Sequence, residues 1–100
     1  MSIEALTEEI RKRAGASPKL GYRLKFVLAE GGTILWDGTD VPPAIDNSDG
    51  DADTTIRVTT DNLHKLMTGG LDPTLAYMTG KLKVEGSLGV AMKLVSMLGD

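Results

Sequence analysis

The sequence predicts one α+β domain over residues 1–100, in which helices cover one face of a mixed β-sheet. One hundred residues suffice for a single domain with one core, and 41% of them are hydrophobic. Apolar residues recur with a helical period in some segments and alternate with polar residues in others. These segments follow the order helix, strands, two short helices, strand, helix, which is typical of a two-layer arrangement.

Residues 3–14 are predicted to form the first helix. Ser2 can cap its N-terminus, and the basic run at residues 11–13 lies in its last turn, where positive charge complements the helix dipole. Gly15 suits the position just after the C-terminal end. The apolar face of this helix comprises Ile3, Leu6, Ile10 and Ala14.

Residues 21–30 and 33–38 alternate apolar and polar side chains and are predicted to pair as a hairpin through a tight turn at Gly31-Gly32. The apolar side of the first strand comprises Leu24, Phe26 and Leu28. The next stretch contains Pro42-Pro43, which cannot join a regular central strand. Any strand near residues 44–45 is therefore expected to be short and at an edge of the sheet.

The C-terminal half is predicted to contain two further strands and three helices. Asp61, Asp72 and Ser87 are the expected N-caps of the helices, and Pro73 suits the first helical position. The expected strands cover residues 53–60 and 81–85, and the expected helices cover residues 62–68, a short segment from residue 73, and residues 88–98.

The sequence is poorly equipped for covalent catalysis. It contains no cysteine, and its one histidine, His64, is expected at the surface, beside the apolar stripe of its helix. Glycine-rich phosphate loops are absent, and four aromatic residues are too few to stack nucleic-acid bases. The acidic stretch 46–53 does not fit a calcium loop, because aligning Gly50 with the loop glycine places ligands at Ile45 and Ile56. We therefore expect no enzyme activity, metal, cofactor or nucleic-acid partner.

Charge is distributed unevenly along the chain. Six basic and no acidic residues lie between Arg11 and Lys25, whereas seven acidic residues and one basic residue lie between Asp37 and Asp61. One interpretation is two solvated faces. The other is that the basic segment meets an anionic partner, such as a membrane surface, a ligand carboxylate or a coenzyme A phosphate.

Residues 69–94 carry a distinctive pattern, Gly-Gly-Leu-Asp-Pro-Thr-Leu-Ala-Tyr-Met-Thr-Gly-Lys-Leu-Lys-Val-Glu-Gly-Ser-Leu-Gly-Val-Ala-Met-Lys-Leu. It resembles the signature of the sterol carrier protein 2 family, which runs Gly-x-x-x-Pro, Met-x-Gly-Lys-Leu-Lys, then Gly-x-x-Gly-x-Ala-x-Lys-Leu. The matching residues are Gly69, Pro73, Met78, Gly80 to Lys83, Gly86, Gly89, Ala91, Lys93 and Leu94. Residues 52–56, followed by Asp61-Asn62-Leu63, are similar to the family's fourth strand and next helix.

The resemblance implies a five-stranded sheet of order 3-2-1-4-5, with an apolar tunnel between the sheet and its helices. Family members bind fatty acids, fatty acyl-CoA, sterols and other lipids. The implied lining from the strands comprises Leu24, Phe26, Leu28, Trp36, Ile56, Val58, Leu82 and Val84. The implied lining from the helices and their connections comprises Leu66, Met67, Leu71, Leu75, Met78, Met92 and Val95. Candidates for contacting a ligand head group are Arg11, Lys19, Arg23 and Lys25.

Two functions are favoured by the sequence, and a third, a small hydrolase or transferase, would require a role for His64. The first is binding and intracellular carriage of a hydrophobic ligand, most readily a fatty acid or acyl-CoA. The second is a non-catalytic accessory domain for enzymes of lipid or quinone biosynthesis. The chain departs from the family pattern over residues 37–51, where an altered third strand or tunnel rim is expected. Without a signal peptide or a peroxisomal Ser-Lys-Leu ending, a cytoplasmic protein is expected.

Overall fold

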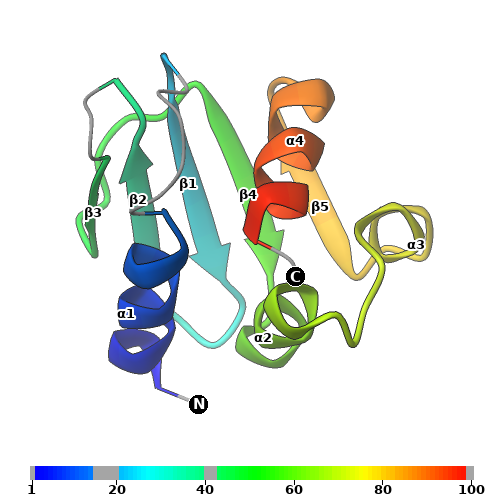
Figure 1. Ribbon diagram of the computed structural model, residues 1–100. Coiled ribbons are helices and arrows are strands. Elements are labelled where there is room, and N and C mark those ends of the chain that lie inside the picture. The colour runs from blue at the N-terminus through cyan, green and yellow to red at the C-terminus, as the bar shows by residue number, and fades with distance from the viewer. Residues whose placement is uncertain (1, 15–20, 40–42, 99–100) are drawn as a thin grey trace.

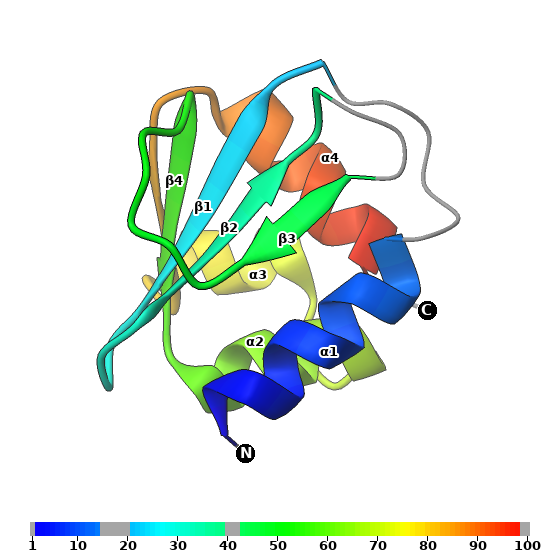
Figure 2. The ribbon, with the colours of Figure 1, turned by 90° about the vertical axis from the view of Figure 1, so that its left-hand side faces the viewer.

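The computed structural model describes residues 2–14, 21–39 and 43–98. In this part of the chain, four helices cover one face of a five-stranded sheet (Figures 1 and 2). The predicted α+β class is therefore confirmed. The elements are α1 (Ile3–Ala14), β1 (Arg23–Leu28), β2 (Thr33–Asp37), β3 (Ala44–Asp46), β4 (Thr54–Val58), α2 (Thr60–Thr68), α3 (Pro73–Met78), β5 (Leu82–Glu85) and α4 (Leu88–Leu98).

The strands lie in the order β3-β2-β1-β4-β5, as the resemblance implies. β1 and β4 are parallel, and the other neighbouring strands are antiparallel. The register places Phe26 beside Ile34 on one side and beside Ile56 on the other. Because side chains alternate between the two faces of a strand, all three residues point toward the helices. The opposite face carries mainly polar and charged residues, together with Val27 and Leu35, and no helix in the described part of the chain packs on it (Figure 2).

The third strand is short and lies at the sheet edge, as predicted. It consists of three residues that pair with β2, and only Ile45 among them is buried. Pro43 precedes it, while Pro42 lies outside the described residues. A proline at this point limits the length of the strand, because proline supplies no N–H to the ladder.

The start of α2 differs from the prediction. Asp61 was expected to be its N-cap, but the cap is Thr59, whose hydroxyl accepts a hydrogen bond of 3.1 Å from the Asn62 backbone N–H. Asp61 lies in the first turn, where its charge complements the helix dipole. The prediction was wrong because threonine and aspartate are both good caps, and β4 ends one residue before Thr59.

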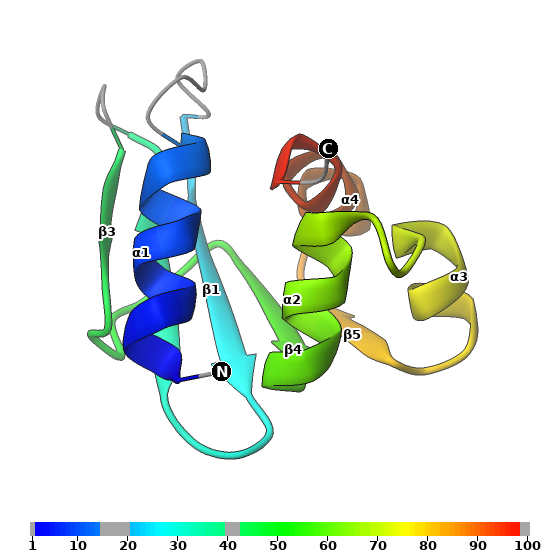
Figure 3. The same ribbon diagram turned by 60° about the horizontal axis from the view of Figure 1, so that its bottom comes forward.

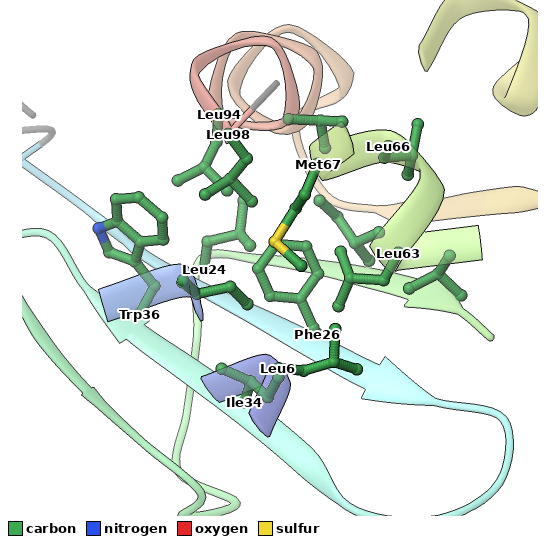
Figure 4. Packing of buried hydrophobic residues seen from close by; sticks show 14 of the residues in the cluster. Leu6, Leu24, Phe26, Ile34, Trp36, Leu63, Leu66, Met67, Leu94 and Leu98 are labelled. Atoms are coloured by element: carbon green, nitrogen blue, oxygen red, sulfur yellow. The ribbon is translucent and has the colours of Figure 1, made fainter. Parts of the chain in front are cut away.

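The core lies between the sheet and the helices, and side chains fill this space (Figure 4). Its largest fully buried members include Trp36, Phe26 and Met67. The tunnel implied by the resemblance is therefore not shown by the structure. The physical reason is the cost of an empty apolar cavity, about 24 cal/mol per Å³, which favours close packing of these side chains.

Candidate functional site

A cleft of about 310 Å³ lies where α2, α3 and α4 meet, and Figure 3 shows these three helices side by side. Two of its lining residues, Leu66 and Val95, also belong to the hydrophobic core. The cleft therefore connects the surface to the layer in which the resemblance places a ligand. Its full lining comprises Leu66, Gly69, Leu71, Asp72, Pro73, Val95 and Ser96.

Local sequence explains why the chain turns around this cleft. Gly69 ends α2 with φ of +81°, a left-handed conformation that glycine adopts at little cost. Three residues later, Asp72 begins α3 by accepting a hydrogen bond of 2.9 Å from the Leu75 backbone N–H. Leu71 lies between the two helix ends and packs against the core while remaining half-buried. The connection thus holds one apolar side chain at the rim.

The structure brings together most of the residues that the resemblance assigns to the ligand. Buried in one cluster are Leu24, Phe26, Leu28, Trp36, Ile56, Val58, Leu66, Met67, Leu82 and Val95. Partly buried and packed against that cluster are Leu71, Val84 and Met92. Whether these residues contact a ligand stays a prediction, since the structure shows only that they share one apolar region.

Leu75 and Met78 do not lie in this region. Their side chains are 58% and 73% exposed, and the buried residue of α3 is Ala76. The resemblance implies that both residues line the ligand site. Successive helical residues are separated by about 100°, so four consecutive apolar residues cannot all face the same side of a helix. This spacing was the signal that could have identified an exposed apolar surface on α3.

The proposed head-group cations are engaged with other groups. Arg11 donates two hydrogen bonds, of 3.0 and 2.7 Å, to the Ile45 carbonyl oxygen and also pairs with Glu8. Arg23 pairs with Asp37 at 3.3 Å. Lys19 lies outside the described residues.

Lys25 is bound in a similar way. Its Nζ lies 2.9 Å from Asp49 and 3.2 Å from the Gly50 carbonyl oxygen. The acidic stretch thus folds back toward the basic strand β1. The side chain of Lys25 points to the sheet face opposite the helices, because it alternates with the buried Leu24 and Phe26. None of the described head-group candidates lines the α2–α3–α4 cleft.

Acidic groups with shifted pKa values also lie away from the cleft. Hydrogen bonds from Thr39, with a smaller contribution from Arg23, lower the pKa of the Asp37 carboxyl group. The hydrogen bond and positive charge of Arg57, whose Nε lies 2.8 Å from the carboxylate, lower the pKa of Glu85. These carboxylates are held in their charged forms, so they are poorly suited to general-acid catalysis near neutral pH.

The structure also bears on catalytic and metal chemistry. Among the described residues, no group of three or more histidine, cysteine, aspartate or glutamate side chains could hold a metal ion. His64 lies half-buried on α2 and is absent from the lining of the cleft. No helix in the described part of the chain has both the length and the apolar character that crossing a membrane requires.

Trp36 carries a polar atom, its indole nitrogen, into the hydrophobic core. Its indole nitrogen is buried and has no hydrogen-bond partner among the described residues. Leaving a buried N–H unpaired costs about 1–3 kcal/mol. Trp36 is also the single tryptophan of the chain. Its fluorescence therefore reports directly on the buried core.

A second cleft, of about 390 Å³, lies at the ends of β1 and β4 and the start of β5. Three of its lining residues are cationic: Arg57, Lys81 and Lys83. No acidic side chain is part of its lining. Lys81 and Lys83 belong to the family-like pattern at residues 69–94, but that pattern did not predict a cationic cleft.

Known proteins resemble this chain in sequence. The sequence pattern described as the SCP-2 sterol transfer family matches residues 3–99. Sterol carrier protein 2 from Bos taurus is 47% identical over 51 residues, which are 51% of this chain and 9% of that protein. The matched segments make up 9% to 12% of the length of such curated relatives.

Solved structures share the fold at lower identity. Palmitated SCP2L2 from Aedes aegypti has a TM-score of 0.76 at 22% identity, with 100% of this chain and 96% of that chain covered. UbiJ-SCP2, a ubiquinone synthesis protein, has a TM-score of 0.73 at 18% identity, with 98% and 93% covered. These likenesses concern the fold alone. Because the family pattern matches residues 3–99 of the 100-residue sequence, the chain belongs to the SCP-2 sterol transfer family.

Proposed function

We propose that this chain binds one hydrophobic ligand between its helices and its sheet and carries it within the cell, without covalent chemistry. The observation that carries the proposal is the α2–α3–α4 cleft, two of whose lining residues, Leu66 and Val95, belong to the buried core. Membership of a sterol transfer family supports the same function.

A fatty acid or fatty acyl-CoA is the ligand we propose first, ahead of sterol-like or isoprenoid lipids. Burying an acyl chain contributes about 0.8 kcal/mol per methylene, so a chain of about sixteen carbons gains enough to offset the cost of ordering it. The palmitated state of a structural neighbour supports this choice. Because apolar burial is non-directional, we expect loose selectivity among lipids of similar length.

Binding requires space that core side chains now fill. We propose that α3 and α4 move apart from the sheet and that the ligand replaces the contacts they lose. Met67 and Met92, one buried and one partly buried, suit such a site because an unbranched thioether adapts to differently shaped neighbours. The half-buried Leu71 at the cleft rim would meet the ligand first.

Substitution of Leu71 tests this site. We expect Leu71→Gln to lower the affinity for a fluorescent fatty acid about tenfold, because the ligand must desolvate the polar side chain at the rim. Leu35→Gln is the matched control: Leu35 is also half-buried but faces away from the helices on β2. Melting temperatures of both variants separate lost binding from lost folding. Equal affinities for the two variants, or no acyl binding by the unaltered chain, would contradict the proposal.

The second candidate is an accessory domain that presents a lipid intermediate to biosynthetic enzymes. The fold shared with a ubiquinone synthesis protein favours it. Vesicle-to-vesicle transfer of a bound fluorescent lipid by the isolated chain supports carriage. Stable association with a quinone-biosynthesis enzyme, without any transfer, supports the accessory function instead.

A further inference from the structure

The second cleft brings three cations together at one end of the sheet. Arg57 lies on β4, Lys83 lies on β5, and Lys81 directly precedes β5. Lys81 and Lys83 alternate with the buried Leu82, so their side chains point away from the helices, toward the open face of the sheet (Figure 2). None of the described lining residues is acidic. Positive charge is thus gathered on the side of the sheet opposite the α2–α3–α4 cleft.

Strand register places two of these cations directly opposite each other. Arg57 of β4 pairs with Lys83 of β5, and like charges in such a position destabilise a sheet. Arg57 is partly compensated, because its Nε lies 2.8 Å from the Glu85 carboxylate. Neither Lys81 nor Lys83 forms an ion pair within the part of the chain that the structure describes. Among these residues, two positive charges therefore remain uncompensated, although the whole chain carries a net charge of −3.

A further carboxylate near this end of the sheet is bound elsewhere. Glu30 follows the lining residue Ala29 and accepts hydrogen bonds of 3.1 Å from both the backbone N–H and the hydroxyl group of Thr60. It thus occupies the N-terminal end of α2 and is not part of the cleft lining. The charge of the cleft is left for a ligand to balance.

The cleft combines this charge with apolar residues. Its lining includes the half-buried Val27, which pairs with Arg57 in the β1–β4 register, and the core residues Leu28 and Val58. Small-molecule sites typically have volumes of about 300–1,000 Å³, a range that includes this cleft. A phosphate monoester matches its two uncompensated charges, since it carries a charge of about −1.5 to −2 near neutral pH. Its oxygens also accept charge-assisted hydrogen bonds from lysine and arginine.

We propose that the cleft formed by Arg57, Lys81 and Lys83 binds a small phosphate monoester. The two lysines contact the phosphate oxygens, Arg57 donates from its guanidinium group, and Val27 packs against the organic part of the ligand. This site shares no lining residue with the α2–α3–α4 cleft. The inference therefore goes beyond the proposed function and does not depend on it.

Titration of phenyl phosphate into the full chain, followed by amide NMR, tests the site. We expect saturable shifts around the cleft, with a dissociation constant of about 1 mM or lower that rises with added salt. Phenyl sulfate is the matched ligand control, because it has the same ring but a single negative charge. We expect it to bind about fivefold more weakly. Inorganic phosphate should also bind more weakly, since it has no apolar group to bury.

Substitutions in the cleft have opposite expected effects. Lys81→Gln and Lys83→Gln should each weaken phenyl phosphate binding about fivefold through the loss of one charge. Glu85→Gln should strengthen it about twofold, because it removes the carboxylate that competes for Arg57. Lys83→Gln should not lower the melting temperature, since it removes a like charge opposite Arg57. Lys12→Gln, an exposed lysine variant on α1, is the control and should bind like the unaltered chain.

The proposal is overturned by equal affinities for the unaltered chain and both cleft lysine variants, or by no saturable shift at about 10 mM phenyl phosphate. A loss of binding with Lys12→Gln alone would also overturn it. Saturating fatty acid should leave the affinity for phenyl phosphate unchanged, and competition between the two ligands would contradict a separate site. If the chain binds no fatty acid but phenyl phosphate follows the predicted pattern, the proposed function is wrong and this site holds.

Discussion

Gly86 follows β5 and packs against the start of β4. Its φ is +104°, and a Cβ built on it would lie 2.7 Å from the Asp53 carbonyl oxygen and 3.1 Å from the Thr54 Cα. Only glycine allows so close an approach of two backbones. The family signature placed a glycine at this position, but the sequence does not reveal which backbone it approaches, because Asp53 is distant along the chain.

Alanine at Gly86 is expected to destabilise the fold more than alanine at Gly69. Both glycines have positive φ, but a Cβ at Gly69 would meet nothing within 4 Å. Gly69→Ala should therefore lower the free energy of unfolding by about 1 kcal/mol from backbone strain. Gly86→Ala should cost about 1–3 kcal/mol more, because backbone atoms must shift. Urea denaturation measures the difference, and equal losses would contradict the contact with β4.

At the level of elements, periodicity predicted which segments are helical or extended, and the structure confirms their order. Their ends were less well predicted, since several residue types serve as caps. The sequence pattern does not distinguish Thr59 from Asp61 as the cap of α2 until the last residue of β4 is known. The outward orientation of α3 was also missed, because Leu75, Ala76, Tyr77 and Met78 surround the helix and define no single apolar face.

The cap assignment predicts a contrast between two substitutions. Thr59→Ala removes the hydroxyl that accepts from the Asn62 N–H and should lower the free energy of unfolding by about 1 kcal/mol. Asp61→Ala removes only a first-turn charge and should cost about 0.5 kcal/mol or less. Thermal unfolding by circular dichroism gives the comparison. A larger loss with Asp61→Ala would show that aspartate caps the helix.

In the whole molecule, charge runs that are separate in sequence become neighbours. Arg23 lies directly opposite Asp37 in the β1–β2 register, and Lys25 meets Asp49 across the loop that precedes β4. This folding explains why the basic segment is a poorer candidate for an anionic partner than composition alone indicates. Predicting it requires strand register, which alternation fixes for the hairpin but not for the loop after β3.

The candidate site was predicted as a set of apolar residues and not as a shape. Alternation and helical period predicted that Leu24, Phe26 and Val95 face the core, and all three are buried. Such patterns predict burial alone. The cleft depends on where α2 ends and α3 begins, so Gly69, Asp72 and Ser96 carried no ligand signal in the sequence. Tertiary packing positions them.

Native mass spectrometry of the freshly purified chain tests the central claim most directly. We predict a non-covalent adduct of one lipid per chain, with a mass in the fatty-acid or acyl-CoA range, that is lost on gentle activation. We also predict that added fatty acid restores the adduct to delipidated protein and shifts the fluorescence of Trp36, which lies in the core. A folded chain that carries no lipid, and takes up none from excess fatty acid, acyl-CoA or sterol, would contradict the account.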